Sequence, residues 1–151
     1  MSEKVKITVY SNLLYAVFFG AFLSATGGLF VDGTIDLRGF PLMFFVSTGI
    51  GFIMGMLIPS GKISGTIASK VAQPGTFLFR LVMYSVLMVI ILIYMCPLMT
   101  IIKGCLIMGT PLKALIPSMY SLFVPFFILC TAALMIVGDP IMNLAKRLAA
   151  K

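Results

Sequence analysis

The sequence predicts an all-α integral membrane protein with four transmembrane helices, arranged as two parallel helical-hairpin repeats. Of its 151 residues, 61% are apolar and only 10% are charged, and the mean hydropathy is +1.17. A soluble domain carries about 25% charged residues, because its surface faces water. The apolar residues also lie in runs of about twenty, which match the roughly 30 Å hydrocarbon core of a bilayer.

Four apolar runs define the predicted spans, at residues 9–30, 40–58, 77–102 and 115–137. They are apolar on all sides, as lipid-embedded helices are, and lack the alternation of barrel strands. The first run is too long for the apolar core of a signal peptide, and no small-residue cleavage site follows it. We therefore expect all four runs to be helices that stay in the membrane.

The basic residues predict the orientation. Four spans place both termini on one side, which carries eight of the eleven Lys and Arg side chains: Lys4, Lys6, Lys62, Lys70, Arg80, Lys146, Arg147 and Lys151. The positive-inside rule then predicts a protein of the cell inner (cytoplasmic) membrane with its N- and C-termini in the cytoplasm. The net charge of +7 is thereby assigned to membrane lipids and not to nucleic acid.

The outer connectors of the two halves share a pattern. The stretches 33–43 and 109–119 have Gly, Thr, Pro and Met at the same four places, and Gly28 matches Gly104 at the same offset. Gly is expected to end the outgoing helix in a left-handed or tight-turn conformation, and Pro to open the incoming helix. The pattern predicts one transmembrane domain, residues 1–151, with hairpin repeats at 9–71 and 77–151; convergence on common helix punctuation is the alternative.

A second repeated pattern lies at the inner ends of the hairpins. Pro59, Ile63 and Ile67 have the spacing of Pro140, Leu144 and Leu148. In the tail, Asp139 is expected to cap a helix that has Pro140 in its first position. The sequence therefore predicts a short amphipathic interfacial helix at 140–150, with Ile141, Leu144 and Leu148 on one face.

The Gly and Pro residues at the ends of these predicted helices resemble those of an uncharacterised family of short bacterial membrane proteins, domain-of-unknown-function family 2798. The chain departs from that family in having no Trp near the start of the second helix. The resemblance implies two tandem copies of a hairpin and no catalytic activity. The matching positions are Gly28, Pro41 and Pro59 in the first half, and Gly104, Pro117 and Pro140 in the second.

The spans lack the side chains on which membrane catalysis and ion coupling depend. They contain no Asp, Glu or His, and their one cation, Arg80, lies near an inner end. Intramembrane carboxylates usually mark proton or cation coupling. The cysteines, Cys96, Cys105 and Cys130, form no CxxC and no metal-ligand spacing. We expect neither an enzyme nor a cofactor or metal site.

Two prolines suggest a ligand path. Pro97 and Pro125 lie within predicted spans, where each would free a backbone carbonyl, that of Ile93 or Ser121. In lipid a freed carbonyl must find a partner or line a wet cavity. Hydroxyl-bearing neighbours, Tyr120 among them, favour a ligand site, although kinks satisfied inside the bundle explain the pattern equally well. The candidate ligand-binding residues are Tyr94, Pro97, Thr100, Ser118, Ser121, Pro125 and Thr131.

Small residues mark candidate helix-packing faces. Gly51 and Gly55 form a GxxxG pattern, which lets another helix backbone approach closely. The approaching helix could belong to the same chain or to another subunit, and the pattern also arises by chance in apolar sequence. The candidate packing residues are Gly20, Ser24, Gly27, Gly28, Gly49, Gly51 and Gly55.

These features leave two classes of function open. The first is a small transporter or channel-like protein for a neutral or amphipathic solute, which the sequence does not identify. The alternative is a non-transporting membrane subunit or scaffold that binds lipid or a partner membrane protein. The charge bias favours one orientation in the membrane, so we expect a parallel homo-oligomer or a subunit of a larger assembly.

Overall fold

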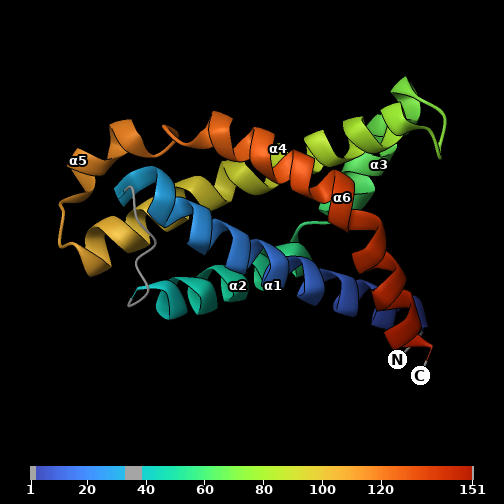
Figure 1. Ribbon diagram of the computed structural model, residues 1–151, viewed down its shortest axis with the longest axis horizontal. Coiled ribbons are helices and arrows are strands. Elements are labelled where there is room, and N and C mark those ends of the chain that lie inside the picture. The colour runs from blue at the N-terminus through green and yellow to red at the C-terminus, as the bar shows by residue number, and fades with distance from the viewer. Residues whose placement is uncertain (1–2, 33–38, 151) are drawn as a thin grey trace. The chain divides into compact units, whose positions relative to one another are not determined.

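The computed structural model describes residues 3–32 and 39–150, and all regular structure in these two ranges is helical (Figure 1). These ranges contain six α-helices, and two other short helical turns lie between α4 and α6. In chain order the elements are α1 (Glu3–Asp32), α2 (Phe40–Leu57), α3 (Ser60–Val71), α4 (Phe77–Ile101), a π-helical turn (Ile102–Ile107), α5 (Leu112–Leu115), a 3₁₀ turn (Ile116–Ser118) and α6 (Phe123–Ala149).

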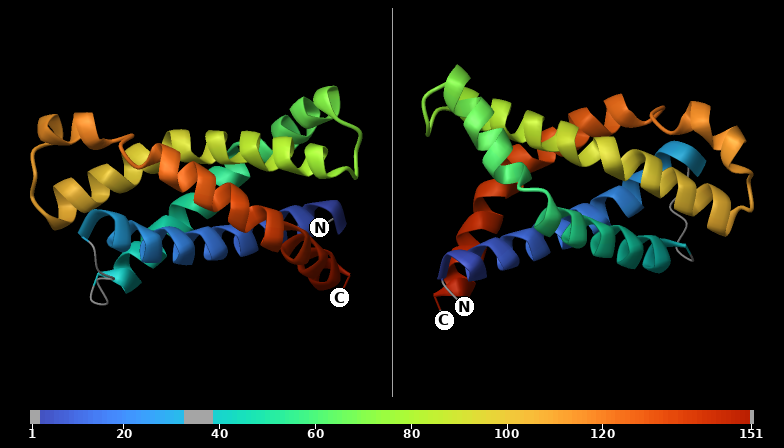
Figure 2. Two further views of the ribbon diagram at one scale, coloured as in Figure 1. Left: turned by 45° about the horizontal axis from the view of Figure 1, so that its top comes forward. Right: turned by 180° about the vertical axis from the view of Figure 1, so that it is seen from behind.

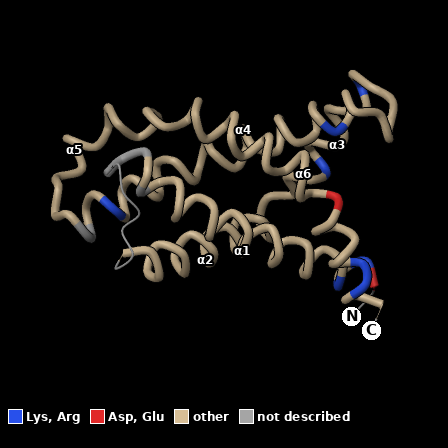
Figure 3. Tube along the Cα trace, viewed as in Figure 1, with Lys and Arg blue, Asp and Glu red and all other residues tan. Residues whose placement is uncertain are grey.

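The predicted class and number of spans are confirmed. Within the described ranges, four helices are long and apolar enough to cross a membrane, with spans at Glu3–Gly27, Phe40–Leu57, Phe77–Cys105 and Phe123–Ala149. Long stretches of α1, α2 and α4 carry no charged residue (Figure 3). The protein is thus an all-helical membrane protein with four spans.

The chain divides into two compact units. One comprises Met1–Ile58 and Gly138–Lys151, and the other comprises Pro59–Val137. The helix α6 therefore contributes to both. The predicted hairpin 9–71 assigned residues 60–71 to the first half, but these residues form α3, which packs on α4 in the second unit.

In the first unit, α1 and α2 pack as an antiparallel hairpin (Figure 2). Gly39 precedes α2, and Pro41 occupies its first turn, as the sequence predicts; at this position the missing N–H of proline costs nothing. The helix ends at Leu57, and Ile58 is extended, the conformation that a following proline favours. The matching Gly33 lies outside the described residues.

In the second unit, α4 has a well-defined start and a loosened end. The Thr76 hydroxyl accepts a hydrogen bond from the Phe79 N–H at 3.2 Å, which caps the helix. At the other end α4 continues into the π-helical turn, and Gly109 follows with φ +65°. This left-handed conformation is the role predicted for the connector glycine. Pro117, however, lies in the 3₁₀ turn and does not open the next span.

Two predicted boundaries of the fourth span are wrong. The span begins at Phe123 and not near Leu115, because α5 and the 3₁₀ turn occupy residues 112–118. At the other end, α6 passes through Pro140 to Ala149, so Asp139 and Pro140 do not start a separate helix 140–150. In the part of α6 after Pro140 the buried side chains are Ile141, Ala145 and Ala149, whereas the predicted stripe residues Leu144 and Leu148 are exposed.

Candidate functional site

The α1–α2 contact contains short side chains spaced four residues apart on each helix, with Thr48 beside Ser47 on α2. Facing residues on α1 are Asn12, Ala16, Gly20 and Ser24, and those on α2 are Ser47, Thr48, Gly51 and Gly55. Positions four apart lie on one face of a helix, so each set forms a continuous stripe. We call these eight residues the small-residue seam.

The closest approach in the seam is at Gly20. A Cβ at this position would overlap the Thr48 hydroxyl and lie 3.2 Å from both the Thr48 Cβ and its backbone nitrogen. The Ser47 hydroxyl donates to the Gly20 carbonyl at 3.3 Å. Because Ser24 Oγ also lies 3.4 Å from Ser47 Oγ, this end of the seam is both tightly packed and hydrogen-bonded.

The other end of the seam contains the GxxxG pair. A Cβ on Gly51 would lie 3.6 Å from the Ala16 Cβ, and Gly55 faces Asn12. The Asn12 amide donates to the Gly55 carbonyl at 3.0 Å. In the structure the pair Gly51 and Gly55 therefore faces α1 of the same chain.

The remaining predicted packing residues lie elsewhere. Gly27 and Gly28 are near the C-terminal end of α1. Gly49 lies two positions from Gly51, about 200° around the helix, and therefore faces away from α1. A Cβ there would meet no atom within 4 Å. On the same outward face lie the exposed side chains of Leu42, Phe45, Ile53 and Met56.

The carbonyl freed by Pro97 has a partner inside the protein. Pro97 lies within α4, and the Tyr120 hydroxyl donates to the Ile93 carbonyl at 3.3 Å. A neighbouring segment thus replaces the hydrogen bond that the proline removes. This contact supports the alternative in which the kink is satisfied internally.

The predicted kink at Pro125 is absent. Since α6 begins at Phe123, Pro125 occupies its first turn, where backbone N–H groups have no helical partner anyway. Ser118 and Ser121 lie in the exposed connector before it. Their hydroxyls donate to the carbonyls of Leu115 at 2.9 Å and Ser118 at 2.8 Å, so both are used locally.

The last three candidate ligand-binding residues lie on α4 and α6. Tyr94 and Thr100 are half-buried on α4. Thr131 is buried on α6, and its hydroxyl is one of the buried side-chain groups that have no hydrogen-bond partner in the described part of the chain. Among the described residues, no hydrogen bond joins Tyr94, Thr100 or Thr131 to another of the seven candidates. Hydrogen bonds therefore do not connect them into one polar network, and a shared ligand site stays a prediction.

Two polar residues in α1 were not predicted from the sequence. Asn12 bonds α2, and the Tyr15 hydroxyl donates to the Gly138 carbonyl of α6 at 3.1 Å. Asn12 continues the stripe of Ala16, Gly20 and Ser24 at intervals of four, so the spacing itself could have revealed its place in the seam. Nothing local indicates the partner of Tyr15, which is 123 residues away along the chain.

Comparison with known proteins gave no relative. No family model, no curated protein and no solved structure matched the chain. The resemblance to domain-of-unknown-function family 2798 and the duplication of a hairpin therefore stay predictions.

Proposed function

We propose that the protein is a non-transporting membrane scaffold that assembles with a second copy of itself through the outward face of α2. The observation that carries this proposal is the position of Gly49. It leaves a gap between Phe45 and Ile53, whose side chains are 71% and 58% exposed. A glycine between large apolar residues provides the notch into which a helix of a neighbouring subunit packs.

The difference between the two faces of α2 supports this proposal. Its small-residue seam is already filled by α1, and Ser47 is the residue of α2 that is buried. The outward face contacts nothing at Gly49 within 4 Å. Without a hydrophobic driving force in lipid, helix association depends on close packing, and small residues at the interface provide it. The uneven charge distribution predicts the same orientation for neighbouring copies, as a parallel dimer requires.

The test is energy transfer between labelled copies in bilayers at decreasing protein-to-lipid ratio. Gly49→Leu fills the notch and should weaken association on the order of tenfold, since overpacking costs about 1–3 kcal/mol. Gly61→Leu is the matched control, because Gly61 is a helical glycine of α3 that also has no atom within 4 Å of a Cβ. Equal association of Gly49→Leu and Gly61→Leu, or no transfer above random encounter for the unmodified chain, would contradict the proposal.

A solute-binding or transport role is the second candidate, and Thr131 favours it. Thr131 is 7% exposed, and its hydroxyl has no hydrogen-bond partner among the described residues. An unpaired polar group in the membrane costs free energy. A bound solute or water would supply the missing partner. Ser121 and Ser118, by contrast, already donate to local carbonyls.

The transport role predicts that Thr131→Ala changes uptake by reconstituted vesicles for at least one neutral solute in a panel. Ser121→Ala should change it less, because its hydroxyl lies in the exposed connector. Thr131→Val is the control for side-chain shape, since valine has the shape of threonine without its hydroxyl. A change in uptake shared by Thr131→Ala and Thr131→Val is then due to loss of the hydroxyl. Solute permeability equal to that of protein-free vesicles would eliminate this role and leave the scaffold.

A further inference from the structure

We propose that α3 and the start of α4 form a binding site for anionic phospholipid, in which lysines hold the phosphate headgroup and an apolar stripe contacts the acyl chains. The site goes beyond the proposed scaffold role and does not depend on it. Its position follows from the chain: α3 lies between the span that ends at Leu57 and the span that begins at Phe77. A segment of twelve residues between two spans is held at the membrane surface.

The faces of α3 are clearly divided. Ser64 and Ala68 are buried, and their small side chains fit the packing of α3 on α4. Ile63, Ile67 and Val71, at intervals of four, form a second stripe that is 40–60% exposed. An exposed apolar stripe beside polar residues is the arrangement of an interfacial helix, whose apolar side enters the boundary of headgroups and acyl chains.

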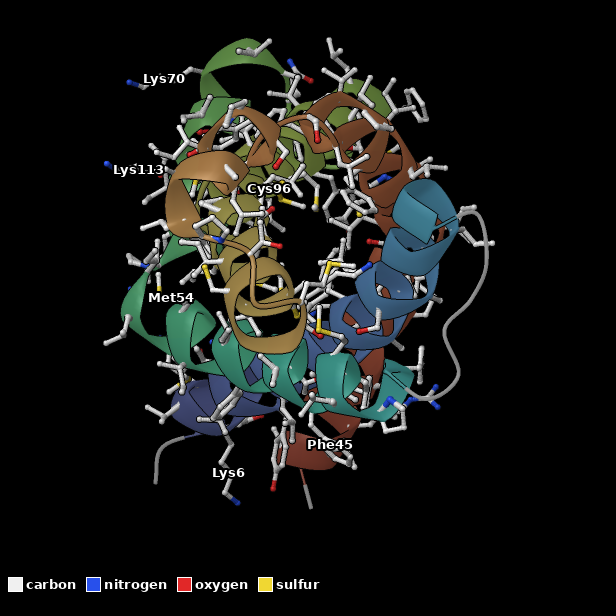
Figure 4. All side chains as sticks on the ribbon, turned by 90° about the vertical axis from the view of Figure 1, so that its left-hand side faces the viewer. Lys6, Phe45, Met54, Lys70, Cys96 and Lys113 are labelled. Atoms are coloured by element: carbon white, nitrogen blue, oxygen red, sulfur yellow. The ribbon has the colours of Figure 1, made fainter. Side chains whose placement is uncertain are left out.

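The charge of this segment is of one sign. Residues 60–80 contain Lys62, Lys70 and Arg80 and no Asp or Glu. Lys62 and Lys70 are exposed, and the Lys70 side chain extends outward (Figure 4). Within α3 these lysines lie on the polar side, adjacent to the stripe of Ile63 and Ile67. This charge complements the phosphate of an anionic lipid, and a zwitterionic lipid offers no net charge to it.

The exposed apolar stripe and the positive charge together favour a lipid over a soluble partner as the ligand. The exposed stripe of Ile63 and Ile67 is followed in the chain by Phe77 and Leu78, which are also exposed and begin the α4 span. Thr66 and Ser69 donate to carbonyls within α3, at 2.9 Å each, so their hydroxyls are already used in the helix. Headgroup binding therefore depends on the lysines.

The experiment is native mass spectrometry of the whole chain, released from bilayers of phosphatidylglycerol and phosphatidylcholine with identical acyl chains at equal mole fractions. We expect retained phosphatidylglycerol to exceed phosphatidylcholine. Lys70→Gln should lower that ratio about fivefold, the contribution of one lysine near an anionic surface. Lys113→Gln is the matched control: it removes the same charge from α5, where Lys113 is also exposed (Figure 4). It should change the ratio less than twofold.

A second variant separates anchoring from headgroup selection. Ile67→Ser keeps both lysines, so it should lower the total lipid retained without changing the ratio of the two lipids. Inorganic phosphate added before release should not displace phosphatidylglycerol. Equal effects of Lys70→Gln and Lys113→Gln would overturn the proposal, because charge alone would then explain retention. Displacement by phosphate, or equal retention of both lipids by the unmodified chain, would overturn it as well.

Discussion

The hairpin of α1 and α2 and the region of α4 use opposite kinds of packing. The seam between α1 and α2 consists of Gly, Ala, Ser, Thr and Asn, whereas the buried face of α4 consists of the large side chains of Tyr84, Met88, Leu92 and Met95. Small residues bring backbones together, so the short side chains of Ser47 and Asn12 reach carbonyls of the facing helix. Near Pro97 of α4, by contrast, the long side chain of Tyr120 donates to the Ile93 carbonyl.

The comparison indicates that the two regions use different side chains for the hydrogen bonds between their segments. In lipid, apolar burial does not distinguish helix from helix, so association depends on packing and on hydrogen bonds. A close contact permits short donors and many dispersion contacts. At Pro97 the long side chain of Tyr120 supplies a hydrogen bond where the helix itself lacks one. The two regions therefore should respond differently to the same kind of substitution.

The largest effect is expected from Gly20→Ala. The added Cβ overlaps the Thr48 hydroxyl, and Thr48 has little freedom to move because its side chain is β-branched. We expect the hairpin to lose about 1–3 kcal/mol. In a chain with its native cysteines replaced by alanine, a disulfide between Ser24→Cys and Ser47→Cys should form less completely, because α1 and α2 separate.

Gly51→Ala is the matched control for this prediction. It adds the same methyl group to the same seam, but its Cβ would lie 3.6 Å from the Ala16 Cβ, an ordinary contact. Disulfide yield should stay at the level of the unsubstituted seam. If Gly20→Ala and Gly51→Ala reduce the yield equally, the seam is loosely packed and the contrast between the two regions fails.

The spans were predictable from the sequence, and the contacts between helices were not. Apolar composition marks every membrane-spanning helix, so all four were found. The same signal gave a wrong start for α6, because residues 112–122 are nearly as apolar as the span that follows. An apolar connector helix and the end of a span look alike in sequence, and Pro117 is consistent with either.

The candidate site was likewise only partly predictable from the sequence. Gly49 and Gly51 belong to one glycine-rich stretch, yet one faces outward and the other faces α1, which depends on the rotation of the whole helix. The punctuation at Asp139 and Pro140 is typical of a helix start, but α6 continues through it. Packing of Ile141 and Ala145 and the Tyr15 contact to Gly138 override that local signal. Such effects come from partners distant in the chain.

The smallest predicted effect is at Tyr120, and it tests the other side of the comparison. Tyr120→Phe removes the donor to the Ile93 carbonyl and should cost about 0.6 kcal/mol, the average for such bonds in membranes. The readout is thiol labelling of the buried Cys130 in a chain that keeps no other cysteine. Labelling should become about threefold faster if it follows local opening. Tyr10→Phe is the control, since the structure gives the Tyr10 hydroxyl no hydrogen bond among the described residues.

A double-mutant cycle with Pro97→Ala decides whether Tyr120 acts by replacing the missing helical hydrogen bond. Alanine restores an N–H four residues after Ile93, so the carbonyl regains a partner within α4. Tyr120→Phe should then have little effect on Cys130 labelling. An unchanged threefold effect in the Pro97→Ala background would mean that Tyr120 contributes through ring packing alone. In that case the Tyr120 hydroxyl would not compensate for the proline, and the contact would depend on packing of the large side chains.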